Sequence, residues 1–158
     1  MNTLYIEQSA IIHAPSDLVY SIVADYEVGH RAILPKPYFQ EMVVEEGGYG
    51  AGTVIRLKMV VMGQTFNYHM RVTEPEPGRI IQESDQDTAQ WSRFVLDEVS
   101  DNTQTRITIQ SEFPLMPGFM GWMQRLTTPM IVRKIYREEL AILNRYAQQQ
   151  MRVAAATS

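Results

Sequence analysis

The sequence contains no cysteine among its 158 residues. This absence excludes disulfides, thiol nucleophiles, cysteine zinc sites and thiolate-held iron–sulfur clusters. No stretch approaches the roughly 18 to 20 uninterrupted apolar residues of a membrane span, so we expect no integral membrane contact. The segment Met1–Glu7 lacks a basic patch followed by an apolar run, so it predicts no secretory leader. We therefore expect a cytoplasmic protein.

Positive charge and histidine are also scarce. Lys and Arg total 14 against 18 Asp and Glu, and this net charge of −4 argues against a broadly basic nucleic-acid-binding protein. The histidines are His13, His30 and His69, and no two of them have the HxxxH or HxH spacing of paired metal ligands. Each falls on a predicted outer face or in a loop, so we expect no metal site.

The glycine-rich stretch Gly47–Gly52 does not have the context of a phosphate-binding loop. Such loops run from a strand into a helix N-terminus, where backbone amides meet phosphate. Here the strand-like segment 53–61 follows, and no Gly-Lys-Ser/Thr motif occurs. We expect no nucleotide or other cofactor, and a flexible loop at the mouth of any cavity.

The composition is that of an ordinary globular protein, with 45% hydrophobic and 20% charged residues, and the length suits a single domain. Residues 3–13 predict a strand in which apolar side chains alternate with polar ones. Pro15 then suits the first turn of a short helix, whose apolar residues recur at i, i+3, i+4 and i+7 up to Tyr26. A second short helix is expected over about 27–34, before Pro35.

From Tyr38 to Phe113 the apolar period changes to two. Turn signals recur every 8 to 14 residues, and the runs between them are rich in Val, Ile, Thr and aromatic residues. Connections this short require antiparallel neighbours, because a parallel crossover needs a dozen or more residues. Six such strands follow the short helices, and residues 3–13 add a seventh.

The C-terminal part predicts one long helix. A helical period runs from about Pro117 to Met151, with a kink at Pro129, and residues 152–158 are expected to form a flexible tail after a single domain, 1–151. The sheet has one apolar face to cover, and only this helix is long enough to cover it. We therefore predict an α+β fold: a curved seven-stranded antiparallel sheet, two short helices after the first strand, and a long C-terminal helix packed over a cavity.

A stripe of flexible apolar side chains on this helix is predicted to face the cavity. Methionine is unbranched and polarizable, so it suits an adaptable apolar wall, although the same side chains could equally be ordinary core packing. Phe94 has the opposite parity to Trp91 in its strand, and we place Phe94 inside. The predicted ligand-binding residues are Ile55, Leu57, Met59, Phe66, Tyr68, Met70 and Phe94 on the sheet, with Met116, Met120, Met123, Thr127 and Met130 on the helix.

No catalytic set is apparent in the sequence. There is no Gly-x-Ser-x-Gly motif, and most carboxylates are predicted at turns or on outer strand faces. Tyr68 is the candidate catalytic residue, because its hydroxyl would face the cavity opposite Thr127 and could hydrogen-bond a ligand carbonyl. The alternative is a tyrosine that is simply hydrogen-bonded within the core.

Basic residues are concentrated toward the C-terminus. Residues 116–158 contain six Lys or Arg and two Glu, a net charge of +4, while the rest of the chain carries −8. A basic outer helix face could contact an anionic membrane or an acidic partner, or it could simply be solvated. The sequence leaves the oligomeric state open.

Three segments stand out within the predicted order of one strand, two short helices, six strands and a long helix: Ile11 to Tyr20 (IIHAPSDLVY), Ala24–Tyr26 and Gly47–Gly52. They resemble the entry into the first helix, the end of that helix and the glycine-rich loop of the START-like helix-grip (SRPBCC) superfamily and its polyketide cyclase/dehydrase-like group. The resemblance implies a cavity for a hydrophobic or amphipathic small molecule such as a lipid or a polyketide. Binding of such a ligand is the expected function. The alternatives are a polyketide cyclase or dehydratase, and a membrane- or protein-interaction module that uses the basic helix.

Overall fold

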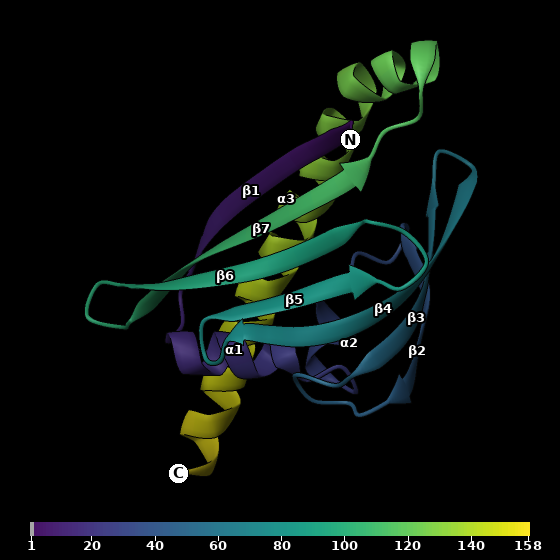
Figure 1. Ribbon diagram of the computed structural model, residues 1–158. Coiled ribbons are helices and arrows are strands. Elements are labelled where there is room, and N and C mark those ends of the chain that lie inside the picture. Colours follow the sequence, from purple (N-terminus) through teal and green to yellow (C-terminus); the bar gives the residue numbers. More distant parts are fainter. Residues whose placement is uncertain (1) are drawn as a thin grey trace.

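The computed structural model describes residues 2–158, which form one antiparallel sheet of seven strands together with three helices (Figure 1). The strands are β1 (Thr3–Ile12), β2 (Phe39–Glu46), β3 (Val54–Val61), β4 (Gln64–Glu76), β5 (Ile80–Asp85), β6 (Trp91–Val99) and β7 (Gln104–Pro114). The helices are α1 (Ser16–Ala24), α2 (Gly29–Ile33) and α3 (Gly118–Thr157). The predicted α+β helix-grip fold is confirmed.

The sheet is a meander from β2 to β7, and β1 pairs with β7, giving the order β1-β7-β6-β5-β4-β3-β2. The alternation of apolar residues decides which face of each strand is buried. In β5 every second residue is buried, at Ile81, Glu83 and Asp85. Two of these three buried side chains are carboxylates, which an apolar core does not explain.

The long helix α3 covers the inner face of the sheet and lies behind it in Figure 1. Its buried residues downstream of Pro129 recur with the helical period and include Ile135, Tyr136, Glu139, Leu140, Leu143 and Ala147. Pro129 lies inside the helix as expected, and in Figure 1 the first turns run at an angle to the rest.

The helix differs from the prediction at its C-terminal end. We expected it to end near Met151 and residues 152–158 to form a tail, whereas it continues to Thr157 with its last residues exposed. The segment is rich in alanine, the best helix former, and so needs no tertiary contact to favour helical geometry.

The two short helices close one end of the sheet, and the glycine-rich loop is fixed against them. Tyr26 N–H donates to the carbonyl of Gly48 at 2.9 Å, and Gly50 N–H donates to the carbonyl of Ala24 at 2.9 Å. This part of the loop is therefore tied to the end of α1, and no residue of 47–52 lines the large cavity of the described chain. The glycine-rich loop was expected at the cavity mouth, and this expectation is wrong. Its positive-φ glycines instead allow the backbone of the loop to contact the end of α1 closely.

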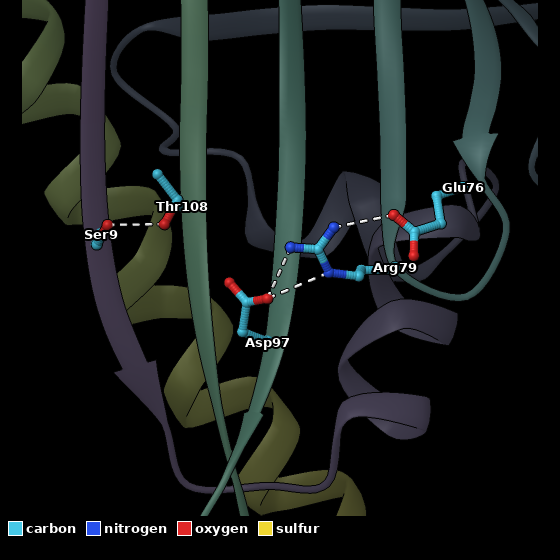
Figure 2. A network of polar contacts seen from close by, with 5 residues as sticks. All are labelled: Ser9, Glu76, Arg79, Asp97 and Thr108. Carbon is cyan, nitrogen blue, oxygen red and sulfur yellow. Dashed lines mark hydrogen bonds and ion pairs between the residues drawn. The ribbon is translucent and has the colours of Figure 1, made fainter.

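The outer face of the sheet carries polar contacts between neighbouring strands (Figure 2). The Arg79 guanidinium donates to Asp97 Oδ1 at 2.8 Å and to Glu76 Oε2 at 2.9 Å, while Ser9 and Thr108 share a hydrogen bond of 2.8 Å across β1 and β7. The ionic side chains here are about half exposed, and exposed ion pairs contribute at most about 1 kcal/mol each. We assign this network to the local structure of the outer face.

None of the helices among residues 2–158 combines the length and the apolar character needed to cross a bilayer.

Candidate functional site

A cavity of about 850 Å³ lies between α3 and the inner face of the sheet. All seven strands, helix α2 and helix α3 contribute to its wall. Ten of the twelve residues predicted to face it do line it: Ile55, Leu57, Met59, Phe66, Tyr68, Met70, Phe94, Met116, Met120 and Thr127. Phe94 faces inward and is 3% exposed, as the parity of β6 predicts.

The other two predicted residues, Met123 and Met130, lie on the exposed side of α3, where they are 38% and 72% exposed. The reason is the 100° step of the helix. The side chains that line the cavity follow Met120, Gln124, Thr128, Ile131 and Ile135, at steps of three or four residues. Met123 and Met130 lie on the neighbouring face of the helix, outside this row of residues. The predicted row of cavity-facing residues was therefore partly wrong.

The mouth of the cavity lies between the β3–β4 hairpin and the first turns of α3. Met62 of the hairpin is 86% exposed, and Met116 and Met120 are 52% and 55% exposed, yet all three line the cavity. Phe66 stands at the same rim. An apolar ligand that enters would therefore meet flexible apolar side chains first.

The inner end of the cavity, away from this exposed rim, carries buried polar side chains. Glu83 of β5 is 6% exposed, and its Oε1 accepts a hydrogen bond of 2.7 Å from the hydroxyl of the fully buried Tyr26. The imidazole of His30 stacks on the Tyr26 ring at 4.3 Å, with its Nε2 at 3.3 Å from the same Glu83 oxygen. Because His30 Nδ1 lies 2.7 Å from the Val23 carbonyl, which can only accept, Nδ1 carries a hydrogen. A proton on Nε2 would then make His30 and Glu83 an ion pair.

Glu139 of α3 lines the same cavity and is 3% exposed. No residue in the described range 2–158 hydrogen-bonds its carboxyl group. Burial, together with the negative charge of Glu83, raises the pKa of Glu139 from 4.5 to about 8. At neutral pH Glu139 is therefore mainly a neutral acid, able to donate a proton into the cavity.

A chain of hydroxyl groups lies beside the two carboxyls. The Tyr136 hydroxyl and Ser111 Oγ are 2.5 Å apart, and Ser111 Oγ is 2.7 Å from Ser92 Oγ. Burial raises the pKa of Tyr136, so the phenol remains protonated. Tyr136 and Ser92 both line the cavity, which gives the inner end neutral hydrogen-bonding groups as well as carboxyls.

The predicted polar residues Tyr68 and Thr127 are both on the cavity wall. Tyr68 is partly buried, and burial raises its pKa. The Thr127 hydroxyl donates to the Met123 carbonyl at 2.9 Å within its own helix. Thr127 therefore presents mainly its methyl group to a ligand, while the phenol of Tyr68 remains the candidate that we predicted.

Sequence reasoning missed the residues of the inner end. His30 was expected on the surface but is 3% exposed, because α2 folds it between Tyr26 and Phe94. Glu83 and Glu139 were not singled out, because most carboxylates were expected at turns or on outer faces. The apolar pattern could have located both residues. Glu83 lies two residues after Ile81 and so on the same buried face of β5, and Glu139 follows Ile135 by four residues on the buried face of α3.

Sequence comparison decides the family. The profile described as "Polyketide cyclase / dehydrase and lipid transport" matches residues 3–148, nearly the whole chain. The chain belongs to this family. Membership supports a ligand-binding or cyclase role for the cavity. No curated protein sequence matches the chain.

Solved structures agree with the fold of the polyketide cyclase/dehydrase family. The solution structure of the KanY protein has a TM-score of 0.80 at 20% identity, covering 94% of this chain and 99% of its own. The Zhui aromatase/cyclase from Streptomyces sp. R1128 has a TM-score of 0.77 at 21% identity, covering 97% and 98%. Norcoclaurine synthase from Thalictrum flavum, solved with dopamine and hydroxybenzaldehyde, has a TM-score of 0.68 at 13% identity, covering 94% and 88%. At these identities the likeness concerns the fold alone.

Proposed function

We propose that the protein binds an amphipathic small molecule in the cavity, with the apolar part toward the mouth and the polar part toward Glu83 and Glu139. The observation that carries this proposal is a cavity of about 850 Å³ whose walls are mostly apolar and whose lining includes the buried carboxyls of Glu83 and Glu139, away from the exposed rim. Cavities of about 300–1,000 Å³ with a few convergent polar groups are the usual form of a small-molecule site. The flexible methionines at the rim suit ligands of more than one shape.

A bulky side chain at the cavity wall is expected to block binding. Thr127 lines the cavity and is exposed, so Thr127→Trp adds volume at the entrance without disturbing the buried core. Leu126 is 56% exposed and lies outside the cavity wall, so Leu126→Trp is the matched control. Titration with decanol, followed by calorimetry, should show at least about a tenfold loss of affinity for Thr127→Trp, or about 1.4 kcal/mol. Equal affinities for the two variants, or no decanol binding by the wild type, would overturn the proposed site.

A second candidate, a cyclase or dehydratase acting on polyketide-like substrates, is favoured by the two carboxyls at the inner end. The raised pKa of Glu139 makes it an acid at neutral pH, and Glu83 stands beside it as a potential base. With a β-diketone in the cavity, Glu83 would take the proton from the carbon between the carbonyls while Glu139 gives its proton to a carbonyl oxygen. The product of this step is an enol, the nucleophile that an intramolecular aldol cyclisation requires.

Exchange of that carbon-bound proton tests the enzyme candidate without knowledge of the natural substrate. We expect the protein to accelerate deuterium uptake into a long-chain β-diketone in D₂O, followed by NMR. Glu139→Gln, which keeps shape but cannot give up a proton, should lower the protein-dependent rate by about 10²- to 10⁴-fold. Tyr68→Phe in the same assay tests the role that the sequence suggests for the phenol, and an unchanged rate would remove it. An equal rate with Glu139→Gln would exclude the acid role of Glu139.

The remaining alternative, an interaction module, rests on the net charge of residues 116–158 alone and stays a prediction.

A further inference from the structure

The charges around the cavity are one-sided. Three carboxyl-bearing residues line it, namely Glu83, Asp85 and Glu139, each at most 9% exposed. Within residues 2–158, the cavity wall contains no Lys or Arg, and His30 is the only imidazole on it. A buried site with this composition disfavours an anion and favours a group that carries positive charge.

The three carboxyl groups differ in the hydrogen bonds that they accept. Glu83 accepts the Tyr26 hydroxyl at 2.7 Å, and Asp85 accepts both the His69 N–H at 3.0 Å and the Thr88 hydroxyl at 2.7 Å. Glu139 has no such partner among the described residues, although it is 3% exposed and lines the cavity. Among the described residues no fully buried side-chain oxygen or nitrogen lacks a partner, so the unpaired Glu139 oxygens reach the space of the cavity, where a ligand can supply a donor.

We propose that the inner end of the cavity binds the ammonium group of an amphipathic amine, between the carboxyls of Glu139 and Glu83. The inference rests on the proposed binding function and adds the chemical class of the ligand. An ammonium group has three donors and one positive charge, so it can pair with Glu139 and still reach a second acceptor. Its hydrocarbon part then extends along Met70 and Ile131 toward the rim.

Binding of an amine couples to the protonation of Glu139. The ammonium ion stabilises the ionised carboxyl, so Glu139 loses its proton when the amine binds below about pH 8. The titratable groups that face this end are Glu83 of β5, His30 of α2, Tyr26 before α2, and Tyr136 of α3. Burial raises the pKa values of both tyrosines, which keeps them neutral.

Three probes of equal chain length separate the charge of the head group from the apolar contribution: decylamine, decanol and decanoate. With the wild-type protein we expect calorimetry to give the highest affinity for decylamine and the lowest for decanoate. The decylamine affinity should rise by up to about tenfold per pH unit from about pH 6 to about pH 8 and then level off, because one proton is released. Decanol should show no such rise.

Glu139→Gln is the decisive variant, because it removes the ionisable group and keeps the size. It should abolish the rise of decylamine affinity with pH, whereas decanol affinity should be independent of pH in both proteins, with circular dichroism as the check on folding. Glu83→Gln serves as the second variant and should also weaken decylamine selectively. If decanol binds and decylamine binds no better than decanoate, the inference is wrong while the binding function stands. If the pH slope survives in Glu139→Gln, Glu139 is not the partner, and if no probe binds, both proposals fail.

Discussion

Replacing Glu139 with glutamine is expected to raise the free energy of unfolding at pH 8 while leaving it almost unchanged at pH 4.5. The pKa of Glu139 is about 8 in the folded protein, against an ordinary value of 4.5. Between these values the folded state holds a proton that the unfolded state has released, so the stability of the wild type falls as pH rises from about 4.5 to about 8. Above pH 8 both states are ionised, and this contribution no longer changes with pH.

The expected size of this effect is large for one side chain. At about 1.4 kcal/mol per pKa unit, the shift corresponds to on the order of 5 kcal/mol by pH 8. Glutamine has nearly the shape of the neutral acid and no charge to bury, so the variant should lack this slope. Urea unfolding of both proteins from pH 4.5 to pH 9 measures it, and the difference between the two curves removes the other titrating groups. Parallel curves would show that Glu139 is ionised, or well solvated, in the folded protein.

Shortening Leu143 to alanine is expected to lower the free energy of unfolding by about 2–5 kcal/mol. Leu143 is fully buried on α3, in the core that holds the helix on the sheet below the cavity. Its loss removes apolar burial and leaves a void that close-packed neighbours fill only in part. Leu143 is not part of the cavity wall, so the substitution should lower the stability of the packing between α3 and the sheet without changing the cavity lining.

Leu126→Ala is the matched control for this prediction, because it is the same substitution on the same helix at a side chain that is 56% exposed. We expect it to change stability by no more than about 0.5 kcal/mol. Thermal unfolding followed by circular dichroism compares the two variants. For a protein of this size, each kcal/mol of lost stability lowers the melting temperature by about 2–4 °C. Similar melting temperatures for the two variants would mean that the C-terminal part of α3 contributes little to the fold.

The fold was predictable from the sequence because its elements differ in apolar period. In β4 the alternation at Tyr68, Met70 and Val72 could form only one buried face, and the short turns allowed only antiparallel pairing. The helical period after Pro117 left a single element to cover that face. Both patterns involve residues close together in the sequence, so they can be recognised without knowledge of tertiary contacts.

The chemistry of the site was less accessible, because it depends on contacts between distant segments. His30 is buried only because α2 lies over Tyr26 and Phe94, and its partner Glu83 is more than fifty residues away. Carboxylates are usually exposed, so the general expectation for Glu139 outweighed its position on the buried strip. The alanine-rich end of α3 was missed for a different reason, since helix propensity continues there after the apolar pattern stops.

The crystal structure of the protein grown with decanol tests the central claim most directly. We predict density for the alcohol inside the cavity, with its oxygen within hydrogen-bonding distance of the Glu139 carboxyl and its chain running past Ile131 toward Met120 at the rim. A structure in which α3 packs on the sheet with no space between them, or in which decanol lies only on the outer surface, would contradict it.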